Sequence, residues 1–99
     1  MDAITRIALE RKEQVEKHGF TAQHDDLFDG AQLEDAARAV LNEDPDQWPK
    51  GMNSELFFRA SEKPTRERLV VAAALLVAEI DRIDRALART RIAEEPAKA

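Results

Sequence analysis

The sequence predicts an all-α fold, and three observations support that prediction. Apolar residues recur at helical spacing along three long segments, strand-like alternation is absent, and the glycines and most of the prolines lie between those segments or at their ends. We expect the three main helices at about residues 2–18, 30–42 and 65–91. They should form a helical bundle within a single domain, residues 1–92, followed by a disordered tail, residues 93–99.

Composition narrows the classes of function. The 99 residues carry a net charge of −5, which argues against a face that binds DNA or RNA. An acidic chain can still bind nucleotides, because acidic sites hold them through Mg²⁺. The chain has no cysteine, and its longest apolar run, residues 69–78, is far shorter than the roughly 20 residues that span a bilayer. We therefore expect a cytoplasmic protein with no membrane and no nucleic-acid partner.

The first expected helix changes character along its length. Asp2 is the expected N-cap, and Gly19 is the expected left-handed residue that ends the helix. The core-facing stripe is apolar at first but then carries Gln14 and His18, and polar groups on an inward face need partners or water. The neighbouring strip carries acids at three-residue spacing, either as solvated charges or as functional ligands: Glu10, Glu13 and Glu16.

A turn between the first two helices concentrates His24, Asp25 and Asp26. These side chains can ligate a metal or orient a phosphate-bound cation, because carboxylates and imidazole are metal ligands. The alternative is a plain turn, in which aspartates cap nearby backbone N–H groups. Asp29 and Gln32 then match a capping box at the start of the second helix.

Residues 42–63 are interrupted by prolines and are expected to be irregular, with one or two helical turns at residues 54–60. Trp48 in this segment has two open roles. It can cover the exposed side of the core or stack a nucleobase, and burial is the commoner use of a large aromatic ring.

The third expected helix is apolar on most of its circumference through residues 69–78. Such a helix must be surrounded, so either the loop at residues 48–60 covers it or a second copy of the chain does, and we expect a homodimer or higher homo-oligomer. Glu79 lies at the edge of this buried surface and needs a partner. The sequence leaves open whether that partner is an arginine, such as Arg82, or a divalent metal.

Several motifs suggest a family. Residues 10–37 contain E-R-x-x-Q, G-F-T-x-x-H-D-D and G-x-x-L-x-x-A-A, and residues 78–85 read A-E-I-D-R-I-D-R. Together with W-P at 48–49 and K-P at 63–64, this pattern resembles a group of small phage and prophage proteins. That group looks related to the all-α, MazG-like nucleoside triphosphate pyrophosphohydrolases.

The resemblance implies an oligomeric helical enzyme in a bacterial or phage-infected cell. Acidic residues would hold Mg²⁺, or alternatively Mn²⁺, and an activated water would cleave a nucleoside triphosphate between its α and β phosphates. It implies Glu79 and Glu10 as catalytic residues and Glu79, Asp25 and Asp26 as metal ligands. The implied substrate-binding set is His24, Gln14 and Arg82, and Trp48 joins it if its ring stacks a base.

The chain departs from this pattern at positions that should carry acids. Gln32 replaces the acid expected before Leu33, and Glu67-Arg68 stands where Arg-Asp is expected. Val71 replaces an expected lysine, and Arg82 follows Glu79 where the E-x-x-D motif needs an acid. Two hypotheses follow: a pyrophosphohydrolase with full or weakened activity, and a non-catalytic, phage-type helical dimer that acts as an accessory or protein-binding module.

Overall fold

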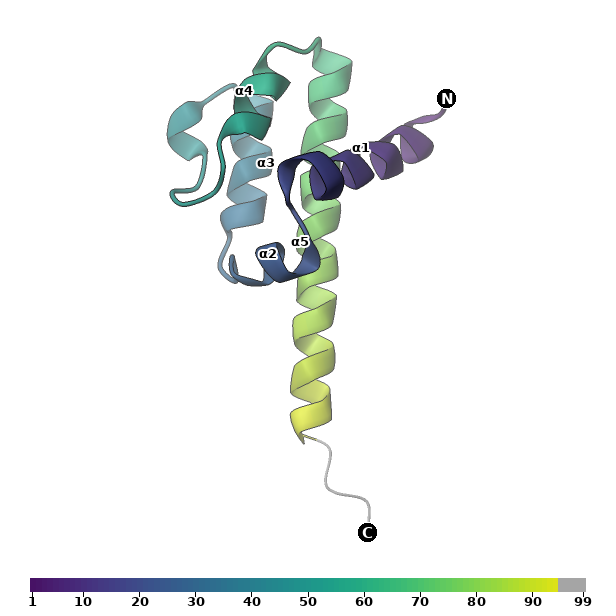
Figure 1. Ribbon diagram of the computed structural model, residues 1–99, viewed down its shortest axis with the longest axis vertical. Helices are drawn as coiled ribbons and strands as arrows, with labels where there is room; N and C mark the ends of the chain where they lie inside the picture. The colour runs from purple at the N-terminus through teal and green to yellow at the C-terminus, as the bar shows by residue number, and fades with distance from the viewer. Residues whose placement is uncertain (95–99) are drawn as a thin grey trace.

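The computed structural model describes residues 1–94, and over that range it contains helices and connecting segments but no strand (Figure 1). The elements in chain order are α1 (Ala3–His18), α2 (Ala22–Asp26), α3 (Gln32–Asn42), the 3₁₀ turn η1 (Pro45–Gln47), α4 (Glu55–Ser61) and α5 (Thr65–Glu94). Helix α3 lies along α5 and runs in the opposite direction, while α1 crosses α5 and α4 contacts all three. The all-α class and the bundle are confirmed, and the homodimer stays a prediction.

The ends of α1 are formed as the sequence predicts. The Asp2 carboxylate accepts a hydrogen bond from the backbone N–H of Thr5 at 2.8 Å, and Gly19 adopts the left-handed conformation with φ of 74°. The predicted capping box at Asp29 is wrong. Helix α3 begins at Gln32 and has no side-chain cap. The Oε1 atom of Gln32 accepts a hydrogen bond from the backbone N–H of Gly30 at 2.7 Å, which closes a local turn.

Helix α5 is longer than its periodicity predicted. It has 30 residues and ends at Glu94, so its length is about 45 Å. Residues 93 and 94 are therefore helical and do not belong to a tail, while residues 95–99 lie outside the described part of the chain. Across residues 1–94, no helix combines the length and the hydropathy that a membrane span requires.

The core forms where α3 faces α5. Ala36 and Ala37 are small and buried, so the two helix backbones approach closely, and Leu33 and Leu75 fill the space beside them. Helices α2 and α4 also contact α5. The apolar run of α5 is thus covered largely within one chain.

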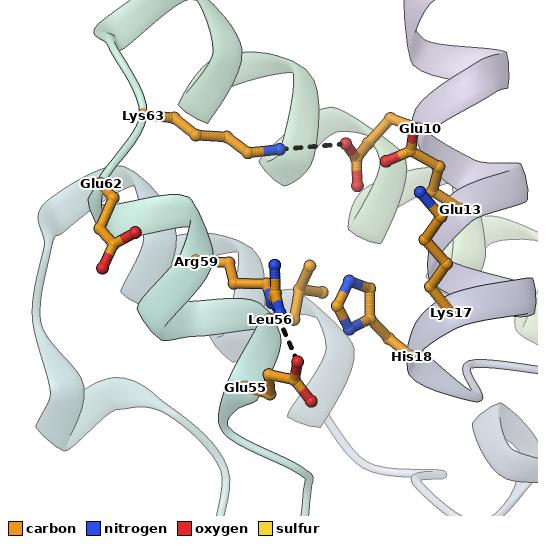
Figure 2. A pocket seen from close by; sticks show the side chains of 9 residues that line it. All are labelled: Glu10, Glu13, Lys17, His18, Glu55, Leu56, Arg59, Glu62 and Lys63. Atoms are coloured by element: carbon orange, nitrogen blue, oxygen red, sulfur yellow. Dashed lines mark hydrogen bonds and ion pairs between the residues drawn. The ribbon is translucent and has the colours of Figure 1, made fainter.

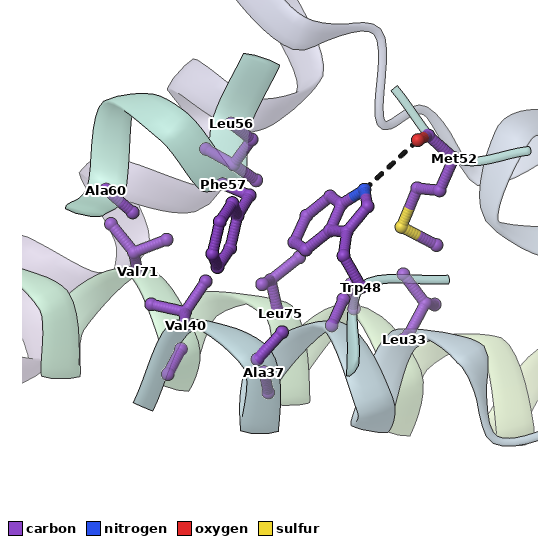
Figure 3. Packing of buried hydrophobic residues seen from close by; sticks show 14 of the residues in the cluster. Leu33, Ala37, Val40, Trp48, Met52, Leu56, Phe57, Ala60, Val71 and Leu75 are labelled. Atoms are coloured by element: carbon purple, nitrogen blue, oxygen red, sulfur yellow. Dashed lines mark hydrogen bonds between the residues drawn. The ribbon is translucent and has the colours of Figure 1, made fainter. Parts of the chain in front are cut away.

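Trp48 closes the open side of this core (Figure 3). Its ring is 9% exposed and lies 5.8 Å from the ring of Phe57 between centroids, and its indole N–H donates to the carbonyl of Met52 at 3.0 Å. The packing alternative is therefore the one that the structure shows, rather than a ring free to stack a base.

We expect Leu33→Ala to lower the free energy of unfolding by about 2–5 kcal/mol, because the removed side chain is fully buried and leaves a cavity. Leu41→Ala on the same helix is the matched control, since Leu41 is 43% exposed and its loss should cost less than about 1 kcal/mol. Urea denaturation at one fixed protein concentration measures both. Equal losses would contradict the proposed core.

Candidate functional site

Glu79, the acid expected to be central, is held by an arginine. The residue is 7% exposed, and its Oε1 accepts from Nε of Arg82 at 2.5 Å, one helical turn further along α5. This hydrogen bond also raises the pKa of Arg82 above its ordinary value, so the guanidinium stays charged. Of the two partners that the sequence left open for Glu79, the structure shows the arginine.

Asp25 is fully buried, and both of its oxygens are used. Oδ2 accepts from Nη2 of Arg11 at 2.6 Å, and Oδ1 lies 2.8 Å from Nδ1 of His24. The His24 ring in turn stacks on Phe20, with ring centroids 4.5 Å apart. A buried carboxylate requires such partners, and here they tie the short helix α2 to α1.

Asp26 points to a different helix from its neighbour. It accepts from Nη2 of Arg85 at 2.9 Å and from Nη1 of Arg89 at 3.3 Å, and both arginines lie on α5. The hydrogen bond from Arg85 is the main reason that the pKa of Asp26 lies below its usual value. The two consecutive aspartates therefore anchor α2 between α1 and α5.

The predicted metal set is consequently not assembled into one site. Glu79, Asp25 and Asp26 have three separate groups of cationic or imidazole partners, and a metal ion would have to displace them. In the part of the chain that the structure describes, no three His, Asp or Glu side chains are grouped so that they could hold a metal ion. These three acids do not fit a shared Mg²⁺ ion.

Glu10 has a different environment. It is 1% exposed, and its Oε2 accepts from Nε2 of Gln14 at 3.3 Å. The same amide nitrogen donates to the carbonyl of Val71 at 3.3 Å, so Gln14 is used to hold Glu10 against α5. Among the described residues, the other oxygen, Oε1, has no hydrogen-bond partner; its nearest cations are Lys63 at 3.7 Å and Arg6 at 3.8 Å. A buried oxygen with unused acceptor capacity favours a ligand that brings a donor or a cation.

Glu10 lines a pocket of about 500 Å³ between α1 and α4 (Figure 2). Its walls carry charges of both signs, from α1 on one side and from α4 and the two residues that follow it on the other. The lining residues are Glu10, Glu13, Lys17, His18, Glu55, Leu56, Arg59, Glu62 and Lys63. His18 extends from α1 toward α4, and its buried Nδ1 also lacks a hydrogen-bond partner among the described residues. We call this cavity the α1–α4 pocket.

Sequence reasoning found part of this pocket and missed the rest. His18 was recognisable as a polar residue at a core-facing position, and Glu10 and Glu13 as acids at three-residue spacing. Gln14 was recognisable in the same way as His18, but it bonds to Glu10 and does not line the pocket. The α4 wall, with Arg59 and Lys63, carried no comparable signal, because its approach to α1 is a tertiary contact. Glu16, the third acid of the series, is exposed and lies outside the pocket.

The lowered pKa of Asp26 predicts a pH dependence of stability. A carboxyl whose pKa is lower when folded adds stability above its unfolded pKa, and this contribution is lost as the pH falls through the folded pKa. The melting temperature of the wild type should therefore fall more steeply than that of Asp26→Asn between about pH 5 and pH 2. The exposed Asp46→Asn is the control and should keep the wild-type slope. Parallel curves for all three proteins would argue against the Asp26–Arg85 contact.

No protein-family model, no curated protein and no solved structure matches this chain. The kinship with MazG-like enzymes therefore stays a hypothesis based on the motifs, and any statement about activity has to be argued from the site.

Proposed function

We propose that the chain is a MazG-like, Mg²⁺-dependent nucleotide pyrophosphohydrolase of reduced activity that works in the cytoplasm, with the α1–α4 pocket as its substrate site. One observation carries the proposal: the carboxylate of Glu10 is buried at the pocket wall, with one oxygen held by Gln14 and the other without a hydrogen-bond partner. The motif resemblance names the reaction class, and this carboxylate provides a group suited to it.

The residues of the pocket fit a nucleoside triphosphate with its cation. Mg²⁺ is commonly bound through one or two carboxylates together with substrate phosphates and water, and Glu10 and Glu13 lie one turn apart on α1. When bound, the ion would neutralise phosphate charge and activate water. Cationic side chains for the phosphate oxygens come from three positions: Lys17, Arg59 and Lys63.

The hydrogen bond from Gln14 holds the Glu10 carboxylate in one orientation. Its Oε1 accepts no hydrogen bond, although Lys63 and Arg6 lie at ion-pair distance, so it can accept a proton from water. The chain has fewer acids than the family pattern requires, because Gln32 and Arg68 stand where two acids are expected. We therefore place the activity below that of an enzyme with the complete signature.

Incubation with a panel of deoxynucleoside and ribonucleoside triphosphates and Mg²⁺ or Mn²⁺ tests the proposal by pyrophosphate release. We expect release by the wild type and a loss of about 100-fold or more in Glu10→Gln, which keeps the shape of the side chain but removes its charge. Glu16→Gln is the matched control on the exposed side of α1 and should retain wild-type activity. No release by the wild type, or equal rates for both variants, would refute the proposal.

The second candidate is a non-catalytic accessory or protein-binding module. Its support is the arginine pairing of Glu79, Asp25 and Asp26, which turns these acids into parts of the scaffold. In such a module the acidic side chains stabilise helix contacts and bind no metal.

This second candidate predicts that millimolar Mg²⁺ leaves the melting temperature unchanged, because a ligand raises stability only when it binds the folded state. Calorimetry with and without the ion measures this, and a matched amount of NaCl controls for ionic strength. A rise with Mg²⁺ that is absent in Glu10→Gln would instead support the hydrolase.

A further inference from the structure

We propose that His18 recognises the nucleobase of the substrate in the α1–α4 pocket, through a hydrogen bond from its Nε2 atom to an acceptor on the base. This inference rests on the proposed function, because it takes a nucleoside triphosphate as the ligand. It goes beyond that function by assigning the base to one end of the pocket and the phosphates to the other. His18 is then a residue that determines specificity, while Glu10 serves the reaction.

The two nitrogens of the His18 ring have different surroundings. Nδ1 is buried and has no hydrogen-bond partner among the described residues. Nε2 also has no partner within residues 1–94, but it is not buried, so it is the nitrogen that a ligand in the pocket can reach. One ring nitrogen of His18 is therefore available for binding.

The unpartnered Nδ1 indicates which nitrogen carries the proton. A neutral imidazole has one N–H donor and one acceptor nitrogen. Buried donors without a partner are rarer in proteins than buried acceptors with unused capacity, so the neutral ring places its proton on Nε2 and leaves Nδ1 bare. His18 therefore presents an N–H donor to the pocket, and the ligand has to bring an acceptor.

The pocket has two different ends along α1. Glu10 and His18 are eight residues apart, which is about 12 Å along the axis of a helix. Figure 2 shows that Glu10 faces Lys63, with 3.7 Å between Oε1 and Nζ, whereas His18 extends toward Glu55 and Arg59 of α4. The catalytic carboxylate and the imidazole are thus placed to contact different parts of one ligand.

The His18 end of the pocket suits an uncharged group. Nε of Arg59 donates to Oε1 of Glu55 at 2.9 Å, so these two charges compensate each other. The buried Leu56, on the same helix, is the residue of the described lining that has no polar side chain. A nucleobase is flat and uncharged and carries acceptor atoms on its edge, so it matches a wall with compensated charge, apolar surface and one N–H donor.

A ligand that uses both ends has to be elongated. Phosphate or pyrophosphate can bind a metal ion at Glu10 and Glu13, but neither is long enough to reach a ring about 12 Å further along α1. A nucleoside triphosphate carries its phosphates and its base at opposite ends, so it meets both. The cavity volume of about 500 Å³ is within the range of sites for small molecules.

Isothermal titration calorimetry with Mg²⁺ tests the assignment. The probes are the four α,β-imido deoxynucleoside triphosphates, which resist cleavage, the corresponding abasic deoxyribose compound and inorganic tripolyphosphate. We expect His18→Phe, which keeps a flat ring but removes both nitrogens, to raise the dissociation constant about tenfold or more for the base that the wild type binds best. Its affinities for the abasic compound and for tripolyphosphate should equal those of the wild type.

Two variants serve as controls. His18→Gln can place an amide N–H donor near the position of Nε2, so it should recover most of the affinity that depends on the base. Glu16→Gln, on the exposed side of α1, should bind every probe as the wild type does. Because His18→Phe removes a buried nitrogen that has no partner, its melting temperature should not fall, which checks that this variant folds.

The outcomes separate this inference from the proposed function. A wild type that binds none of the triphosphates would refute the proposed function and the inference together. If the wild type binds them, but His18→Phe weakens tripolyphosphate as much as the nucleotides or changes no affinity, the inference alone is overturned. A loss that the abasic compound shares would place the contact on the sugar and would overturn it as well.

Discussion

The close approach of α3 to α5 is the contact on which the rest of the molecule depends. Alanines at the crossing allow the backbones to lie near each other, and the larger Leu33, Val40 and Leu75 interdigitate around them. Helix α4 and Trp48 then close one side of the pair, and α1 lies across α5. Since α1 and α4 are both positioned by this pair, the α1–α4 pocket is a consequence of the same packing.

Carboxylates in this protein have divided roles. Asp25 and Asp26 are adjacent in sequence, yet one is bonded to α1 and the other to α5, so together they hold α2 against both helices. Burying a charge is costly unless a partner compensates for it, and arginines supply that compensation here and at Glu79. Glu10 differs: one of its oxygens accepts no hydrogen bond and is opposed only by Lys63 and Arg6 at 3.7 and 3.8 Å, and it faces a pocket. Because Glu10, unlike the other three acids, keeps a buried oxygen that accepts no hydrogen bond, the functional proposal centres on α1.

Helix α5 serves two surfaces at once. Its inner side completes the core with α3, and its outer side carries exposed apolar side chains: Leu69, Leu76, Ile80, Ile83 and Leu87. Over the apolar run at residues 69–78, the chain itself covers most positions, and Leu69 and Leu76 are the exposed ones.

The sequence by itself determined the helical class, the approximate extent of the three main helices and the ends of α1, because periodicity, Asp2 and Gly19 act locally. The Glu79–Arg82 pair was also open to prediction, since it joins residues one turn apart. Tertiary structure decided which buried carboxylate keeps an oxygen without a hydrogen bond. In the sequence, Asp25 and Asp26 resemble a metal-binding motif. In the structure, Arg11 of α1 and Arg85 of α5 bind them. The pocket around Glu10 likewise exists only because α4 folds against α1, a contact between segments about 45 residues apart that no local pattern encodes.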